Sequence, residues 1–186
     1  MDHSAGGGVG GALVQLAKPS GSRVVAVVGS SHKREAVECL GVAAVIDKSR
    51  ERVWERARVE AREGYDVVLD ANGVETLRGS YRHLRPTGRL VVYGFHGMLP
   101  KRGGRPSWPR LAVDWLRTPR FDPLRLTNDN KSVLAFNLSY LFDRMDLLQS
   151  GMDALSRWLS EGALAPLEVT EYPPARVAQP HRAIES

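Results

Sequence analysis

The sequence is nearly devoid of cysteine, since Cys39 is the only one among 186 residues. A single cysteine excludes an internal disulfide and a zinc site built from several cysteines. Chains without disulfides are typical of reducing compartments. The sequence also has no signal-like start and no apolar run near the roughly 18 to 20 residues that a membrane-spanning helix needs. We therefore expect a soluble, cytoplasmic protein.

Several catalytic and metal-binding motifs are absent as well. There is no HExxH pattern and the histidines are too scattered for ligand spacing, so we expect no metal site. The GK[ST] ending of a nucleoside-triphosphate loop is missing too. Asp66 and Asp70 flank one predicted strand, but no matched second acid suggests general acid and base catalysis. We name no catalytic residue. The five histidines are His3, His32, His83, His96 and His181.

The net charge is +5, and 21 of the 26 basic residues are arginine. Most of them alternate with glutamate and aspartate, as in RERVWERARVEAREG (50–64), so no extended positive stripe forms. This pattern is typical of a solvated surface, and we expect no nucleic-acid partner.

Residues 101–125 are the local exception, because basic residues surround Trp108 and Trp115. Such a segment could suit an anionic membrane surface. More often, tryptophan and leucine at helical spacing pack a helix on its own domain or on a subunit, and we favour that interpretation over peripheral membrane contact. The basic residues are Lys101, Arg102, Arg105, Arg110, Arg117, Arg120 and Arg125.

In the first half of the chain, apolar strand patterns alternate with short helical patterns. RVVAVVGSS (23–31) is a continuous β-branched run, typical of a strand buried on both faces. This alternation predicts an α/β fold, a Rossmann-like, mostly parallel, doubly wound sheet with helices on both faces. The further strands are expected at 42–47, 65–73 and 88–94, and the helices at 9–18, 32–40, 49–64 and 74–85, the last one stopped by Pro86.

The second half is less regular. A loop rich in glycine and proline leads from residue 95 to a helix over 108–118, and 132–141 has the pattern of an edge strand running into a loop. An amphipathic helix over 145–162 closes at Gly162. A last strand (167–174) and a partial helix (175–186) follow. We interpret residues 1–186 as one domain, in which 95–131 form an inserted basic loop and amphipathic helix.

AGGGVGG (5–11) directly precedes a predicted helix. A phosphate loop needs glycines because the backbone must turn sharply and approach an anion at a helix N-terminus. The helix and the strand–helix series that follow favour a dinucleotide-binding loop over a flexible turn. Spacing alone does not choose between two registers. These are Gly6, Gly8 and Gly11 (GxGxxG), or, one residue earlier, Ala5, Gly7 and Gly10 (AxGxxG).

No carboxylate follows the predicted strand at 23–31. Sites for NAD generally place an acid there for the ribose hydroxyl, whereas sites for the 2′-phosphorylated cofactor offer a base instead. Lys33 and Arg34 stand at that position and can form charge-assisted bonds to a phosphate. We predict NADP(H) as the cofactor. An S-adenosylmethionine-dependent methyltransferase would also fit the glycine turn, but such sites usually use the acid that is missing here.

The chain resembles the zinc-independent quinone oxidoreductases of the medium-chain dehydrogenase/reductase superfamily, in the branch related to the vesicle amine transport protein. Matching stretches cover nearly the whole chain. LRPTGRLVVYG (84–94) is widespread, whereas FDPLRLTNDNKSVLAFNLSYLF (121–142) is specific to that branch. The resemblance implies hydride transfer from NADPH to a quinone or enone, small-molecule substrates of the complete enzyme.

The resemblance also implies cofactor contacts for particular residues. It selects the AxGxxG register, in which Gly7, Gly8, Val9 and Gly10 lie at the pyrophosphate. It implies Ser30 and Lys33 at the adenosine 2′-phosphate and Asn72 at the middle of the cofactor. Lys48 replaces a tyrosine that relatives often place near the adenine. A lysine there could add a phosphate contact, or the adenine could be bound more weakly. The nicotinamide side would involve Gly94 and Phe95, and its ribose Leu138 and Ser139.

Members of the family carry a GroES-like catalytic domain and a complete first Rossmann strand before the glycine loop. Neither is in this chain, so we expect MDHSA (1–5) to supply only a stub of the central strand in the order 3-2-1-4-5-6. The resemblance therefore indicates an NADP-binding domain that is inactive by itself. Two alternatives stay open, a non-catalytic interaction module and, less favoured, the methyltransferase. The 132–141 edge strand could support a homodimer in either case.

Overall fold

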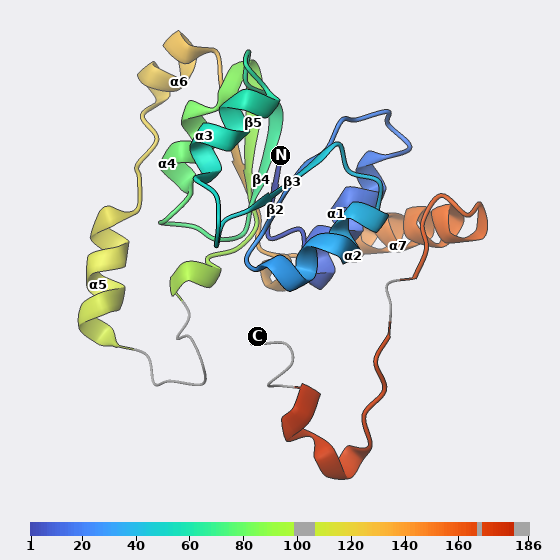
Figure 1. The fold of residues 1–186 in the computed structure, drawn as a ribbon. Coiled ribbons are helices and arrows are strands. Elements are labelled where there is room, and N and C mark those ends of the chain that lie inside the picture. Colours follow the sequence, from blue (N-terminus) through green and yellow to red (C-terminus); the bar gives the residue numbers. More distant parts are fainter. Residues whose placement is uncertain (99–106, 167–168, 181–186) are drawn as a thin grey trace.

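The computed structural model describes residues 1–98, 107–166 and 169–180 (Figure 1). Its centre is a six-stranded sheet in which all neighbouring strands are parallel, in the order β3-β2-β1-β4-β5-β6. This is the Rossmann-like order predicted from the sequence. The strands are β1 (Asp2–His3), β2 (Val25–Val28), β3 (Ala44–Asp47), β4 (Tyr65–Asp70), β5 (Leu84–Val92) and β6 (Ser132–Ala135).

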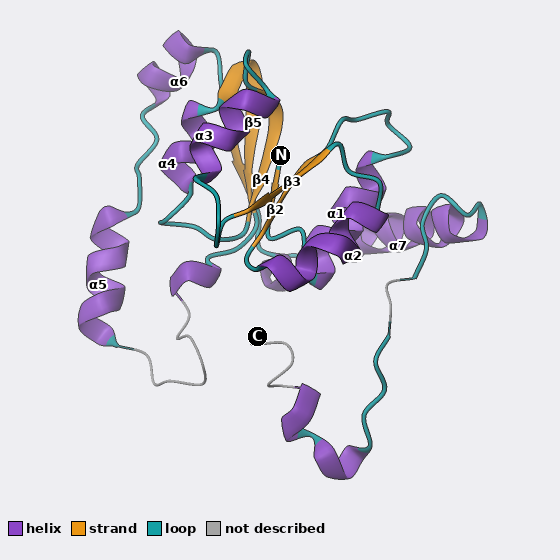
Figure 2. Ribbon diagram, viewed as in Figure 1, coloured by secondary structure: helices purple, strands orange, loops and turns teal. Residues whose placement is uncertain are grey.

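Helices cover both faces of the sheet, with α3 and α4 on one side and α1 and α2 on the other (Figure 2). The labelled α-helices are α1 (Gly8–Ala17), α2 (Arg34–Cys39), α3 (Val53–Glu60), α4 (Leu77–Arg82), α5 (Trp108–Arg117), α6 (Pro123–Asp129) and α7 (Met145–Ser160), and residues 178–180 are helical as well. Short 3₁₀ turns complete the described elements, namely η1 (Ser31–Lys33), η2 (His96–Met98), η4 (Leu138–Tyr140) and η5 (Pro174–Arg176).

Strand β2 explains why both faces are apolar. Val25 and Val27 join the core beneath α3 and α4, whereas Ala26 and Val28 join a second core with α1 and α2. Successive side chains of a strand point to opposite faces, so a strand covered on both sides must be apolar at every position. The continuous β-branched run therefore identified a central strand correctly.

The central strand β1 is two residues long, as expected from MDHSA. Asp2 pairs with Ala26 of β2 on one side and with Leu69 of β4 on the other. The Met1 ammonium donates to the Val67 carbonyl oxygen over 2.7 Å, and burial lowers its pKa to about 6. This short, buried strand pairs with β2 on one side and β4 on the other, and it thus joins the two halves of the sheet.

Strand β5 begins earlier than predicted. We expected Pro86 to follow a helix and the strand to start at residue 88, but α4 ends at Arg82 and Pro86 lies inside β5. The register changes here, since Leu84 pairs with Tyr65 and the next paired residue, Arg89, with Val67. Proline is tolerated in a strand at such an irregularity because its missing N–H is not needed there.

Two further elements differ from expectation. The sequence analysis did not identify α6, although Asp122 caps it by accepting from the Leu124 amide over 3.2 Å and Asn130 ends it in the left-handed conformation. The last strand predicted at 167–174 is wrong for residues 169–174. Residues 169–173 have no strand structure and residue 174 begins η5, while 167 and 168 lie outside the described residues.

The amphipathic helix predicted at 108–118 is present as α5, and its tryptophans are largely exposed, Trp108 at 79% and Trp115 at 63%. It therefore does not bury them on the described part of its own domain, and packing on a subunit stays a prediction. Lys101, Arg102 and Arg105 lie outside the described residues. Within the described ranges, no helix has the length and apolar character needed to cross a bilayer.

Candidate cofactor site

The glycine loop leads from β1 directly into α1. Ser4 adopts a left-handed conformation with φ of 72°, and its carbonyl oxygen accepts from the Gly7 amide over 3.0 Å. Gly7 is the N-cap of α1, whose first turn contains no acidic residue. The first amides of a helix have no partners within it and carry partial positive charge, so this loop points free donors toward an anion site.

Gly10 is the glycine at which α1 approaches β1 most closely. A Cβ atom there would lie 2.7 Å from the Ala5 Cα and closer still to the Ser4 carbonyl oxygen, whereas a Cβ at Gly8 would meet nothing within 4 Å. The third glycine of a dinucleotide loop serves this helix–strand contact. The geometry therefore favours the register Ala5, Gly7 and Gly10 over the literal GxGxxG.

A cleft of about 280 Å³ opens beside this loop, at the carboxyl ends of β1, β2, β4 and β5. Its lining contains no carboxylate and two lysines, so it has a positive character. The structure brings seven of the twelve predicted cofactor residues together here. They are Gly7, Gly8, Val9, Gly10, Lys33, Lys48 and Asn72.

Lys33 and Lys48 reach the cleft from the ends of neighbouring segments. The Lys33 stem packs on Gly6, where an added Cβ would lie 3.1 Å from the lysine Cβ and Cδ, and the Lys48 Cε lies close to Gly29. Ser30, by contrast, is half-buried outside the cleft lining as the N-cap of η1.

Asp47 is the acid at the end of β3, the strand beside β2. Its carboxylate accepts from the hydroxyls of Ser31 and Ser49, and these bonds, the one from Ser31 first, lower its pKa to about 2. These hydroxyls occupy its oxygens, and it does not line the cleft.

Asn72 is held in the cleft by two sets of bonds. Its Oδ1 accepts from the Ser4 hydroxyl over 3.0 Å, and its backbone amide donates to Asp70 Oδ1 over 2.9 Å. Asp70 is fully buried and also accepts from Ser80 and Thr76. The end of β4 is therefore fixed rigidly against the glycine loop, and Asn72 stands between the two.

Gly94 and Phe95 border the cleft without lining it. Gly94 lies against Ala71, where a Cβ would come within 3.2 Å of the carbonyl oxygen, and the Phe95 ring covers Gly73. His96 is exposed and lines the cleft. The loop after β5 is thus part of the site.

Leu138 and Ser139 are not brought to the cleft. Both lie in η4 after β6, where Leu138 is 55% exposed and the Ser139 amide donates to Asn137 Oδ1. Their predicted contact with the nicotinamide ribose has no support in the lining of this cleft.

The sequence analysis missed Ser4 and Tyr93, which also line the cleft. Burial raises the pKa of the Tyr93 phenol, and its hydroxyl donates to the His3 carbonyl oxygen over 3.4 Å. Tyr93 closes the predicted strand VVYG, which is the signal that could have identified it. Ser4 carried no signal, because its role depends on a left-handed backbone.

Among the residues that the structure describes, no three histidine, cysteine, aspartate or glutamate side chains gather as a zinc site requires. Cys39, the one cysteine of the chain, is exposed on α2. These residues do not fit a zinc ion, and we derive no step through one.

Comparison with known proteins gives a consistent result. A family model described as zinc-binding dehydrogenase matches residues 8–145. The Synaptic vesicle membrane protein VAT-1 homolog of Danio rerio is 32% identical over 164 residues, which are 88% of this chain and 34% of that protein. The chain thus spans about a third of that relative's length.

Two solved structures extend the likeness to the fold. The quinone oxidoreductase from Thermus thermophilus, described also in complex with NADPH, aligns with a TM-score of 0.73 at 27% identity, over 98% of this chain and 52% of the other. A putative enoyl reductase domain of a polyketide synthase aligns with a TM-score of 0.69 at 25% identity, over 91% of this chain and 85% of the other.

Proposed function

Because the chain belongs to the zinc-binding dehydrogenase family, we propose that its cleft binds NADP(H) as the cofactor domain of a zinc-independent quinone or enone oxidoreductase. The observation that carries the proposal is the contact of Gly10 with Ser4 and Ala5, beside a cleft lined by two lysines and no carboxylate. The Thermus thermophilus enzyme, known with NADPH, supports the choice of cofactor.

The pyrophosphate of the cofactor would lie at the start of α1. Gly7, Gly8, Val9 and Gly10 provide backbone amides there, and the helix dipole favours the negative charge. A side chain at residue 10 would push the helix away from β1, so this arrangement requires glycine.

The adenosine 2′-phosphate would be bound by Lys33 and Lys48. Both lysines belong to the cleft lining, and a phosphate between two lysines gains charge-assisted hydrogen bonds. Ser30 lies next to this position and would add a hydroxyl from the start of η1. NADPH should therefore bind more tightly than NADH.

Asn72, Gly94, Phe95, Leu138 and Ser139 complete the proposed cofactor contacts. Asn72 is already oriented in the cleft by Ser4, and Gly94 and Phe95 stand at its border. Leu138 and Ser139 would have to approach through a movement of η4 or through a second subunit, because they are exposed outside the cleft.

Bound NADPH would supply a hydride for an electron-poor double bond or a quinone. This chain's own residues would bind the cofactor. No carboxylate lines the cleft, so none would repel the cofactor's phosphates there. We assign residues 1–186 to the cofactor domain and 95–131 to an insertion within it. The substrate would lie against a GroES-like catalytic domain, so the chain by itself should turn over little NADPH.

The exposed strand β6 supports a homodimer through residues 132–141. It lies at the edge of the sheet, and the apolar side chains of Leu134 and Phe136 are 49% and 52% exposed. An edge strand presents unpaired backbone groups that a second copy can pair.

Titration of the purified chain with NADPH, NADH and S-adenosylmethionine, followed by intrinsic fluorescence, tests the proposal. We expect saturable binding of NADPH, weaker binding of NADH and none of S-adenosylmethionine. Absence of binding for both nicotinamide cofactors would favour a non-catalytic interaction module instead. Preferred binding of S-adenosylmethionine would favour the methyltransferase.

A further inference from the structure

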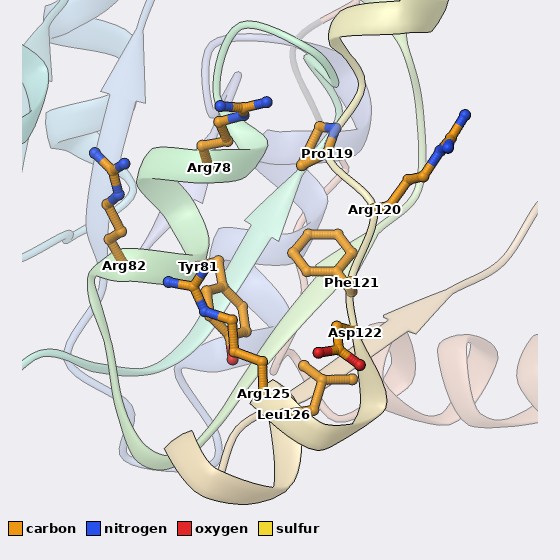
Figure 3. Close-up of a pocket in the computed structure, with 9 residues that line it drawn as sticks. All are labelled: Arg78, Tyr81, Arg82, Pro119, Arg120, Phe121, Asp122, Arg125 and Leu126. Atoms are coloured by element: carbon orange, nitrogen blue, oxygen red, sulfur yellow. The ribbon is translucent and has the colours of Figure 1, made fainter.

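We propose that a second cavity, the arginine cavity, binds a ligand that carries clustered phosphate groups. It is lined by Arg78, Tyr81, Arg82, Arg120, Phe121 and Arg125, together with three further residues, and has a volume of about 250 Å³ (Figure 3). One wall is α4, and the other is the segment that leads from α5 into α6. The arginine cavity shares no lining residue with the cofactor cleft.

The lining is strongly positive. Four of its nine residues are arginines, and its one acid, Asp122, caps α6 by accepting from the Leu124 amide. Arg125 has a distant ion pair with Asp129, at 3.6 Å, and Asp129 also accepts from the Tyr81 hydroxyl. Within the described ranges, no carboxylate lies at ion-pair distance from the other three arginines.

The positive charges of Arg78 and Arg82 lower the stability of α4. They are four residues apart on one six-residue helix, and like charges at that spacing repel each other. Arg52 and Arg56 have the same spacing around α3, but each pairs with a glutamate, Glu55 and Glu60 respectively. The repulsion on α4 is uncompensated among the described residues, so a bound anion would relieve it.

The base of the cavity is rigid and aromatic. The rings of Tyr81 and Phe121 are 5.4 Å apart, and Tyr81 is almost fully buried in the core beneath α4. The Arg125 guanidinium lies 6.0 Å from the Tyr81 ring centre and the Lys131 ammonium 5.1 Å from it. Arg125 therefore stands on a fixed surface, which lowers the cost of ordering it around a ligand.

Arginine side chains stand on both walls of the cavity. Figure 3 shows Arg78 extending from α4 and Arg125 reaching along Tyr81 toward that helix, whereas Arg82 and Arg120 point outward on opposite sides. We assign direct contact to Arg78 and Arg125, and Arg82 adds positive charge from α4. Arg120 adds positive charge at the rim.

Phosphate is the anion that this chemistry fits. Guanidinium groups bind phosphate oxygens in bidentate fashion, and several arginines together prefer a ligand with more than one phosphate. Such groups occur on soluble polyphosphates and on phosphorylated lipid headgroups, which present the same oxygens. The volume is below that of a typical cavity for a drug-sized molecule, about 300 to 1,000 Å³, which suits a compact charged group.

Calorimetric titration with inorganic tripolyphosphate tests the inference. Arg78→Gln combined with Arg82→Gln should weaken binding by about tenfold or more, because one charge-assisted contact and a neighbouring positive charge are lost. Arg52→Gln combined with Arg56→Gln removes the same charge at the same spacing and should leave affinity within about twofold. Circular dichroism of both double variants verifies that they fold, and Arg125→Gln alone should give an intermediate loss.

The remaining arms locate the ligand and can overturn the inference. Phosphatidylcholine vesicles containing phosphatidylinositol 4,5-bisphosphate should bind with the same dependence on Arg78 and Arg82 if the phosphates belong to a headgroup. If vesicle binding does not depend on these arginines, the phosphates that bind the cavity belong to a soluble ligand. The inference fails if tripolyphosphate does not saturate, if both double variants weaken it equally, or if only Lys33→Gln weakens it. Since the cofactor cleft is not used, failure here leaves NADPH binding untouched.

Discussion

The carbonyl oxygen of Ser4 occupies the space that a Cβ atom of residue 10 would need. Ser4 reaches this position through a left-handed backbone, with φ of 72°, and its carbonyl also receives the Gly7 amide. The contact fixes the first turn of α1 against β1 and thereby places the amides that we assign to the pyrophosphate.

Gly10→Ala should therefore destabilise the domain. The added methyl group would force α1 away from Ser4, and overpacking of this kind costs about 1–3 kcal/mol. Urea denaturation should show this loss. Gly8→Ala is the matched control, because a Cβ there meets nothing within 4 Å, and its stability should be unchanged or slightly higher. Equal stability of both variants would contradict the assigned register.

Lys33→Gln and Lys48→Gln should each weaken NADPH without affecting NADH. A charge-assisted bond contributes about 1.5–3 kcal/mol, so each loss should lower NADPH affinity by about tenfold or more. Fluorescence titration of both cofactors measures the ratio. Lys18→Gln, outside the cleft lining, is the control. If NADH weakens in parallel with NADPH, the lysines do not read the 2′-phosphate.

Asp2 should make the stability of the fold depend on pH. Burial raises the pKa of its carboxyl to about 7, although the neighbouring Met1 ammonium acts to lower it. Because the folded pKa is raised, its contribution is complete below pH 3.8 and is lost as pH rises to about 7. Asp2→Asn removes this loss. The variant should gain roughly 2–4 kcal/mol relative to the parent between about pH 4 and pH 8.

The titration of His3 masks that of Asp2 in the parent chain, so the Asp2→Asn variant is needed to measure the effect of Asp2 on stability. Burial lowers the pKa of His3 to about 4, so its contribution is gained as pH rises from 4 to 6.5, opposite to that of Asp2. The parent chain alone would show a nearly flat profile over that window. Urea denaturation of parent and variant at both pH values separates the two, with exposed Glu161→Gln as control. A pH-independent difference would contradict the assigned shift.

Leu134→Lys should dissociate the proposed homodimer. Leu134 is half-exposed on the edge strand β6, and lysine on an edge opposes strand pairing between copies. Light scattering should show a dimer for the parent chain and a monomer for the variant. Val169→Lys, also exposed but outside any strand, should leave the dimer intact. A parent chain that is monomeric at high concentration would exclude this interface.

The strands were predictable because their burial demands a simple pattern. Val25 to Val28 and Tyr65 to Asp70 belong to the covered centre of the sheet, so most of their positions are apolar or β-branched and no other element fits. The start of β5 was not predictable from the sequence. The local rule that proline follows a helix does not hold here, because Pro86 lies where the pairing of β5 with β4 is irregular.

The residues of the cofactor site also divide into those that the sequence predicts and those that it does not. The glycine loop and Lys33 follow from local spacing, since a loop and its adjoining helix are encoded within a few residues, whereas the register of the glycines does not follow from spacing. The contributions of Ser4, Tyr93 and His96 depend on how distant strands align, which one sequence does not reveal. Leu138 and Ser139 were carried over by resemblance alone, and their neighbours on this chain differ from that expectation.

Within the described chain, β1 and the preceding Met1 lie between the pair β2–β3 and the trio β4–β5–β6 and are hydrogen-bonded to both. Because β1 has only two residues, few backbone hydrogen bonds hold the two parts of the sheet together. Anything that pulls on the first three residues, such as a tether fused before Met1, acts directly on the junction of the two halves. Separation of β1 from β4 would also strain the Ser4–Asn72 hydrogen bond that joins the glycine loop to the end of β4.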